Sequence, residues 1–218
     1  QGAVMLLLLA RHGNTFEKGG KAVWVGARTD MPLTGKGREQ AEALGRALAP
    51  IAPRIRREIA GPLRRTREYA SIAAGGLGQG AAVEIDERLR EIDYGLWEGR
   101  TSEEIAALGG AAELKAWDES GAWPHTPGWS PPSAVIAGNA ARLAAECAAT
   151  AGGGGAALLV SSNGILRFFL KLAPGAFEAM AARRTLKVAT GNCCALKLGS
   201  GGWEVLFWNR EPSQLCFE

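Results

Sequence analysis

The 218-residue chain carries a formal net charge of +3, and 47% of its residues are hydrophobic, so it can bury the core of one domain. Its basic residues are dispersed, which argues against a nucleic-acid-binding protein, because such proteins concentrate positive charge on one face. The apolar run "VMLLLLA" (4–10) is too short to cross a membrane and lacks the basic segment of a signal peptide. The four cysteines form no CxxC pair and are expected to be reduced and mostly buried. We therefore expect a cytoplasmic protein with one domain over 1–218.

The first half of the chain alternates between apolar runs and amphipathic segments. "AVMLLLLA" (3–10) is typical of a strand that is buried on both faces. Thr34 is placed to cap a helix over 34–48, in which apolar residues recur at helical spacing. The next segments predict a strand, a helix that ends at glycine and a short strand, at 55–61, 63–75 and 81–86.

The second half continues the alternation. Residues 102–120 are expected to be helical, and 121–132, rich in proline and tryptophan, to form a loop. The later segments predict a long helix, a buried strand, further helices and a closing pair of strands, at 133–150, 156–162, 165–184, 192–199 and 203–209. This order indicates an α/β fold, a three-layer sandwich with a mostly parallel central sheet flanked by helices. Ligands of such sheets bind at the carboxyl ends of strands, where Arg11, His12 and Asn163 are expected.

Arg11 and His12 directly follow the first buried strand, in "LLLLARHGNT" (6–15). A neutral imidazole can attack phosphorus, and a guanidinium can hold two nonbridging oxygens of a phosphate. A lone histidine at a strand end is structural more often than catalytic, so the pair by itself indicates a phosphate site only weakly. The surrounding motifs strengthen that interpretation.

Five motifs resemble those of the histidine phosphatase superfamily, also called the phosphoglycerate-mutase-like family. They follow the family's order from Leu6 to about Leu215, and they read "LARHGNT", "WVGARTDMPLTGKGREQA", "GPLRRTREYA", "LREIDYGLWEG" and "GNCCALKL" with "WNREPSQL". Two positions depart from the family pattern: Gly61 replaces a serine, and Gln214 replaces a late histidine.

The resemblance implies a phosphomonoesterase that works through a phosphohistidine on His12 and uses neither a metal nor a cofactor. Arg11 and Arg65 would bind the phosphoryl oxygens, and Asn14 would donate an amide hydrogen bond to them. Glu91 would protonate the leaving oxygen and later deprotonate water. The expected partner is a phosphorylated small-molecule substrate, and neither nucleic acid nor membrane is expected to bind.

The family's second histidine has no counterpart here. In the family the strand equivalent to "LLVSS" (158–162) leads into a histidine–glycine pair, whereas here Asn163 precedes Gly164. An asparagine amide can donate a hydrogen bond to phosphate, but it carries no charge. The site could accept the loss or recruit another cation, or the protein could bind phosphorylated ligands without turnover. The candidate cations are Arg28, Lys18, Lys21 and His125.

For two residue roles, the catalytic acid and the role of His125, the sequence leaves an alternative open. Asp93 is the rival of Glu91 for the acid role. His125 lies where the family carries a substrate-covering lid, here at about 100–135, and it could bind substrate or simply be an exposed loop residue. Nearby tryptophans could line an apolar mouth or pack the lid, namely Trp117, Trp123 and Trp129.

The expected phosphomonoesterase activity has two alternatives. A cofactor-dependent phosphoglycerate mutase would use the same motifs, and a weakened site would leave a phospholigand-binding protein. The motifs do not identify the substrate, and a homodimer is left open.

Overall fold

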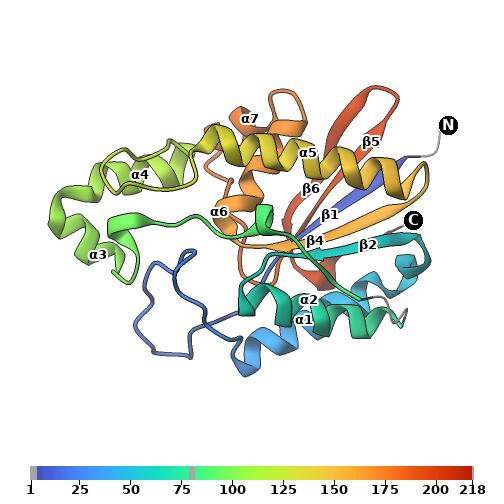
Figure 1. Ribbon diagram of the computed structural model, residues 1–218, viewed down its shortest axis with the longest axis horizontal. Coiled ribbons are helices and arrows are strands. Elements are labelled where there is room, and N and C mark those ends of the chain that lie inside the picture. Colours follow the sequence, from blue (N-terminus) through green and yellow to red (C-terminus); the bar gives the residue numbers. More distant parts are fainter. Residues whose placement is uncertain (1–3, 79–81, 218) are drawn as a thin grey trace.

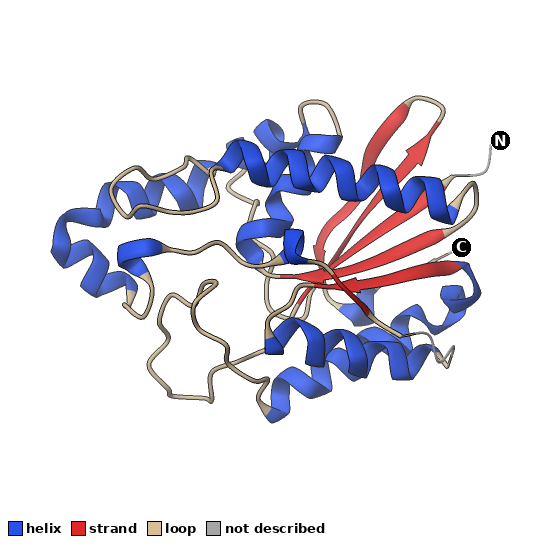
Figure 2. Ribbon diagram, in the orientation of Figure 1, coloured by secondary structure: helices blue, strands red, loops and turns tan. Residues whose placement is uncertain are grey.

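The structure is a computed structural model that describes residues 4–78 and 82–217. Within these ranges a six-stranded sheet lies between two helical layers (Figures 1 and 2). Its strand order is β3-β2-β4-β1-β5-β6. The strands are β1 (Met5–Arg11), β2 (Ile55–Ala60), β3 (Glu84–Ile85), β4 (Ala156–Ser161), β5 (Cys193–Gly199) and β6 (Gly202–Arg210). The neighbours from β3 to β1 are parallel and β5 is antiparallel to β1 and β6, so the α/β fold is confirmed with a mixed sheet.

Helices cover both faces of the sheet, as Figure 1 shows. One face carries α1 (Gly35–Leu48) and α2 (Arg64–Leu77), and the other carries α5 (Ser133–Ala151), α6 (Asn163–Leu166) and α7 (Ala176–Ala182). Side chains of β1 alternate between the two cores: Leu6 and Leu8 face the α1–α2 layer, and Leu7 and Leu9 face the α5 layer. Full burial of one such leucine contributes about 2 kcal/mol. The prediction of a strand buried on both faces is therefore confirmed.

The first predicted helix begins at its expected capping residue. Thr34 caps α1, because its Oγ1 accepts a hydrogen bond from the Gly37 N–H at 3.1 Å.

The adjacent Cys193 and Cys194 point to opposite faces of β5, one into each core, which confirms their expected role in strand packing. Cys147 is also buried, whereas Cys216 is exposed.

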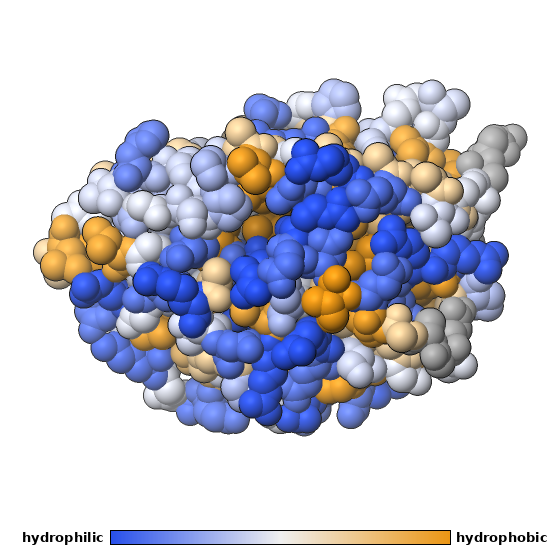
Figure 3. All heavy atoms as spheres, viewed as in Figure 1, coloured by the Kyte–Doolittle hydropathy of each residue, from blue (hydrophilic) through white to orange (hydrophobic). Residues whose placement is uncertain are grey.

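The expected helix over 102–120 is interrupted. It consists of α3 (Ser102–Ile105), a π-helical turn (Ala106–Gly110) and α4 (Ala111–Ser120). Gly109 has φ = 91°, a conformation that glycine adopts without strain, and it bends the segment there. Figure 3 shows apolar side chains at this end of the face, as well as further apolar patches among hydrophilic side chains elsewhere on it.

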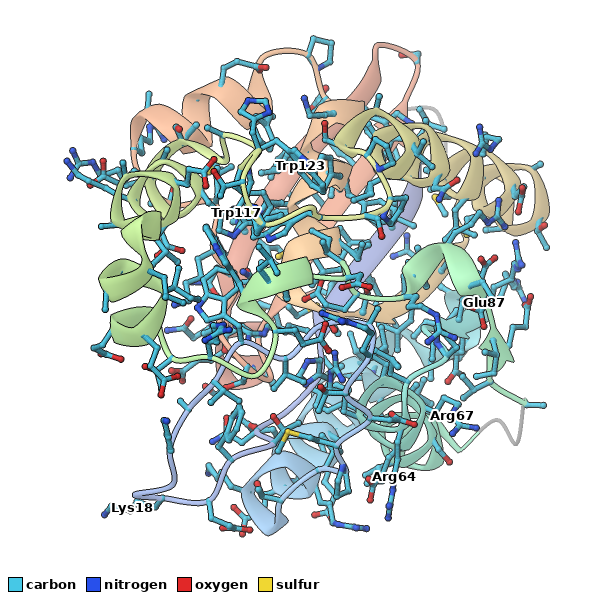
Figure 4. The ribbon with its side chains drawn as sticks, turned by 60° about the vertical axis from the view of Figure 1, so that its left-hand side comes forward. Lys18, Arg64, Arg67, Glu87, Trp117 and Trp123 are labelled. Atoms are coloured by element: carbon cyan, nitrogen blue, oxygen red, sulfur yellow. The ribbon has the colours of Figure 1, made fainter. Side chains whose placement is uncertain are left out.

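The loop over 121–132 folds back and contributes an aromatic cluster. The ring of Trp129 lies within 6.0 Å, between centroids, of five other rings, those of Trp24, Tyr94, Trp97, Trp117 and Trp123. Figure 4 shows Trp117 and Trp123 beside each other. Trp123 and Trp129 therefore pack the segment over 102–132, and Trp117 both packs it and lines the cavity described below.

In the part of the chain that the structure describes, no helix combines the length and apolar character needed to cross a membrane.

Candidate active site

The candidate catalytic residues gather at the carboxyl ends of two adjacent parallel strands. β1 and β4 pair with Arg11 opposite Ser161, so the next residues, His12 and Ser162, leave the sheet side by side. The His12 N–H donates to the Ser161 carbonyl at 3.0 Å. Gly13 then packs against the Gly37 backbone so closely that a Cβ atom would clash. This glycine contact between the β1 turn and α1 fixes the direction in which His12 leaves the sheet.

His12 is held as a neutral imidazole. Its side chain is 5% exposed, and its Nδ1 lies 2.8 Å from the Gly13 carbonyl oxygen. A carbonyl only accepts hydrogen bonds, so Nδ1 carries the proton and Nε2 keeps its lone pair. Burial lowers the pKa of His12 well below its ordinary value, and the positive charges of Arg11 and Arg65 lower it further.

The lowered pKa of His12 makes stability depend on pH. Below the ordinary pKa of 6.5, the unfolded chain binds a proton at His12 that the folded protein does not bind. Folded-state stability should therefore fall as pH decreases from about 6.5, by up to about 1.4 kcal/mol per pH unit for this group. His12→Asn should remove that part of the slope. Urea unfolding of both proteins from pH 5 to 8 measures it, and identical slopes would contradict the prediction.

Two guanidinium groups lie beside His12, that of the half-buried Arg11 and that of the buried Arg65. Arg11 Nη1 donates to the Val188 carbonyl at 2.7 Å, and Arg65 Nη1 donates to the Thr29 carbonyl at 2.8 Å. Burial lowers the pKa of both arginines, and the charge of Arg65 lowers the pKa of Arg11 further. Within the described ranges neither forms an ion pair within 4.0 Å. Two like charges whose hydrogen bonds within the protein go only to carbonyls form a receptor for an anion such as a phosphoryl group.

Glu91 is the carboxyl group of this site. It is 5% exposed, its Oε1 accepts from the Ile92 N–H at 2.9 Å, and its Oε2 accepts from the Gly164 N–H at 3.2 Å. A Cβ atom at position 164 would clash with the carboxylate, so glycine is needed there to seat it. The Tyr94 hydroxyl also hydrogen-bonds to Glu91, and burial raises the Tyr94 pKa well above its ordinary value, which keeps that hydroxyl a neutral donor.

The rival carboxylate, Asp93, is engaged elsewhere. Its Oδ1 accepts from the Gly95 N–H at 2.9 Å and lies 3.1 Å from Nε of Arg28. Glu91 lines the same cavity as His12, whereas Asp93 does not. The geometry therefore favours Glu91 for the acid role.

Asn163 is the first residue of α6 and lines the cavity with His12. Its Oδ1 accepts from the Val188 N–H at 2.9 Å, which leaves the side-chain NH₂ as the free donor of the amide. The backbone of Val188 thus holds two candidate phosphate ligands, Arg11 through its carbonyl and Asn163 through its N–H.

A cavity of about 330 Å³ joins these groups. Its inner part is lined by the residues described above, namely Arg11, His12, Arg65, Glu91, Tyr94 and Asn163. The rest of its wall comes mainly from the loop after β1 and from the 102–132 segment, and consists of Thr15, Phe16, Ala22, Val23, Trp24, Val25, Ser102, Trp117, Asp118 and Lys187.

Several sequence candidates lie outside this cavity. Arg28 pairs with Glu98 and Asp93, and Lys21 pairs with Glu104 at 2.6 Å. Lys18 lies at the tip of an outer loop in Figure 4. His125 is exposed, and its backbone N–H donates to Glu113 at 2.8 Å. The structure therefore does not bring these four cations to the cavity.

Asn14 lies near the cavity without lining it. Its Oδ1 accepts from the Thr190 hydroxyl, and its backbone N–H donates to Oε1 of Gln40 at 2.9 Å. Its expected contact with phosphate stays a prediction.

Two residues near the site were missed from sequence. Ser162 is 1% exposed, and its Oγ has no hydrogen-bond partner among the described residues. Arg167 is also 1% exposed, lies 3.8 Å above the Trp117 ring and donates to the Trp117 carbonyl at 3.1 Å; burial lowers its pKa to about 10. Ser162 could have been found from its place directly before Asn163, but its position beside His12 depends on strand register.

Within residues 4–78 and 82–217, histidine, cysteine and acidic side chains form no group of three or more that could hold a metal ion.

Comparison with known proteins agrees with this arrangement. The profile of the histidine phosphatase superfamily (branch 1) matches residues 7–211, which include His12, Arg65, Glu91 and Asn163. The chain belongs to the histidine phosphatase superfamily. Over 123 residues it is 37% identical to glucosyl-3-phosphoglycerate phosphatase of Mycolicibacterium vanbaalenii, covering 56% of this chain and 52% of that protein.

A second relative of this superfamily carries a mutase name. Over 104 residues the chain is 33% identical to the Erwinia tasmaniensis protein named "Probable phosphoglycerate mutase GpmB", covering 48% of this chain and 46% of that protein. The chain thus spans about half the length of the curated relatives that it matches.

Solved structures of the superfamily share the fold over nearly the whole chain. Mycobacterial glucosyl-3-phosphoglycerate phosphatase in complex with VO3 matches with a TM-score of 0.74 and 25% identity, covering 95% of this chain and 99% of that one. The α-ribazole phosphatase of Shigella flexneri matches with a TM-score of 0.72 and 23% identity, covering 94% and 96%.

Proposed function

We propose that the protein is a metal-independent phosphomonoesterase that hydrolyses a phosphorylated small molecule through a phosphohistidine on His12. One observation carries the proposal: a neutral, buried imidazole shares a cavity with two guanidinium groups and a carboxyl group. These are the groups that a two-step phosphoryl transfer requires. The superfamily relatives named as phosphatases support it.

In the first step Nε2 of His12 attacks phosphorus, and the P–O bond to the alcohol breaks in line. The departing oxygen takes the proton of the Glu91 carboxyl group and leaves as the alcohol. Arg11 and Arg65 neutralise charge on the nonbridging oxygens as it spreads in the transition state. The Nδ1 proton stays on its hydrogen bond to Gly13 and stabilises the cationic phosphoimidazole.

In the second step Glu91, now a carboxylate, takes a proton from water as the water oxygen attacks phosphorus. The N–P bond breaks and its electron pair returns to Nε2 of His12. Inorganic phosphate leaves, and both His12 and Glu91 regain their starting protonation states.

Asn163 would donate its side-chain NH₂ to the phosphoryl group. Asn163→Asp tests this, because the new carboxylate can still accept from the Val188 N–H while it repels phosphate. We expect kcat/KM to fall by about 100-fold or more with the melting temperature nearly unchanged. Ser162→Ala, measured in parallel, tests the buried hydroxyl beside His12. A small change in Asn163→Asp with a large one in Ser162→Ala would assign the donor to Ser162 instead.

The direct test of the proposed function is an assay of the purified protein with p-nitrophenyl phosphate and a panel of alkyl phosphates, with and without EDTA. We expect phosphate release that EDTA does not reduce. The absence of turnover, with phosphate binding detected by calorimetry, would instead indicate a phospholigand-binding protein.

A phosphoglycerate mutase is the second candidate, and its support is the relative of that name. A cofactor-dependent mutase requires a bisphosphoglycerate primer to isomerise 3-phosphoglycerate. The proposed hydrolase should release phosphate without the primer. Primer-dependent isomerisation that outpaces phosphate release would favour the mutase.

A further inference from the structure

The outer part of the cavity differs in character from the phosphate-binding end. Aromatic and aliphatic side chains form most of its wall, among them Phe16, Trp24 and Trp117. Among the described residues, the outer wall carries two charged side chains, Asp118 and Lys187, and their charges are opposite. An apolar wall with two opposite charges suits a small leaving group that carries charge of both signs.

Asp118 and Lys187 come from two segments that an ion pair connects. Asp118 belongs to α4, and Lys187 follows α7. Next to Asp118, the Glu119 carboxylate lies 3.1 Å from Nη1 of Arg184, which is three residues before Lys187. The two charges therefore sit on neighbouring parts of the same rim.

Each of the two charged residues is adjacent in sequence to a residue whose backbone accepts hydrogen bonds from side chains at or near the site, or donates them to such side chains. Lys187 directly precedes Val188, whose backbone holds Arg11 and Asn163. Asp118 directly follows Trp117, whose carbonyl accepts from the buried Arg167. These hydrogen bonds hold the backbones of Asp118 and Lys187 in place relative to the phosphate-binding end.

Asp118 and Lys187 remain available for a ligand. Across the described residues neither has an ion-pair partner within 4.0 Å, and they do not pair with each other, although their neighbours Glu119 and Arg184 do. The Asp118 charge acts on buried Arg167 at longer range. A carboxylate at this rim disfavours a leaving group that is only anionic, and a lysine disfavours one that is only cationic.

We propose that the outer part of the cavity binds an alcohol that carries an ammonium and a carboxylate group on one carbon, so that the substrate is a phosphorylated hydroxy amino acid. Asp118 binds the ammonium, Lys187 binds the carboxylate, and the aromatic wall packs against the carbon chain. This assignment rests on the proposed phosphatase activity and names its substrate class.

Four phosphate esters that differ in one charged group at a time test the assignment. O-phosphoserine carries both groups, 3-phosphoglycerate lacks the ammonium, serinol phosphate lacks the carboxylate, and glycerol 3-phosphate lacks both. We expect kcat/KM to be highest for O-phosphoserine and about tenfold lower for each charge removed. A ranking led by 3-phosphoglycerate or glycerol 3-phosphate would overturn the proposal.

Two variants assign each charge to its residue. Asp118→Asn should abolish the preference for O-phosphoserine over 3-phosphoglycerate, and Lys187→Met should abolish its preference over serinol phosphate. Glu39→Gln and Lys36→Met, which remove the same charges from exposed residues of α1 outside the cavity, should preserve both preferences. Loss of both preferences in the control variants would overturn the assignment to this pair.

The proposed function fails separately from this inference. If wild-type protein does not hydrolyse p-nitrophenyl phosphate, or does so without His12, the phosphatase proposal itself is wrong. If it hydrolyses p-nitrophenyl phosphate through His12 but does not prefer O-phosphoserine, only the substrate class is wrong.

Discussion

His12→Ala is expected to lower the hydrolysis of p-nitrophenyl phosphate by about 10⁴-fold or more, because it removes the nucleophile on which both steps depend. The variant should keep its fold, since the alanine side chain fits a buried position and leaves Arg11 and Arg65 in place. Their guanidinium groups should still bind vanadate or phosphate. Steady-state kinetics together with calorimetric titration of phosphate measures both effects.

The other histidine of this chain, His125, provides the matched control. His125 is exposed and lies outside the cavity, so His125→Ala should keep nearly full activity. Wild-type protein and His125→Ala quenched during turnover should carry a phosphoryl group that is released in acid, and His12→Ala should carry none. Substantial activity in His12→Ala would refute the nucleophile assignment.

Glu91→Gln is expected to slow alkyl phosphates about 100-fold more than p-nitrophenyl phosphate, because a nitrophenolate leaves without help from an acid. Glutamine can still accept from one backbone N–H at this position, but it cannot supply the proton that an alkoxide needs. The measurement is the ratio of kcat/KM for the two substrate types in the variant, divided by the wild-type ratio.

Asp93→Asn is the comparison for Glu91. Asp93 binds Gly95 and Arg28, so its loss should reduce both substrate types by a similar factor. A leaving-group-dependent loss in Asp93→Asn, with none in Glu91→Gln, would transfer the acid role to Asp93.

The fold and the phosphate-binding end could largely be predicted from sequence because their signals are local. The leucine run predicts a buried strand, and Arg11 and His12 directly follow it, so the sheet topology alone brings them to a ligand-binding edge. The resemblance of their motifs to those of the histidine phosphatase superfamily assigned Arg65 and Glu91 to the same site, and all four residues line the cavity.

Other features depend on contacts between distant segments. Arg28 has the charge expected of a phosphate ligand, but Asp93 and Glu98 engage it, and that pairing is visible only in three dimensions. The backbone of Val188 orients Arg11 and Asn163 through its carbonyl and its N–H, which no side-chain pattern reveals. The bend at Gly109 likewise reflects backbone geometry that helical spacing does not predict.

The stereochemical course at phosphorus tests the central claim most directly. A substrate whose phosphoryl group is chiral through oxygen isotopes would be hydrolysed by wild-type protein in isotopically defined water, and the configuration of the product phosphate determined. Two successive in-line displacements, the first by His12 and the second by water, invert the configuration twice, so we predict net retention. Net inversion would show that water attacks the substrate directly, and it would contradict the phosphohistidine mechanism.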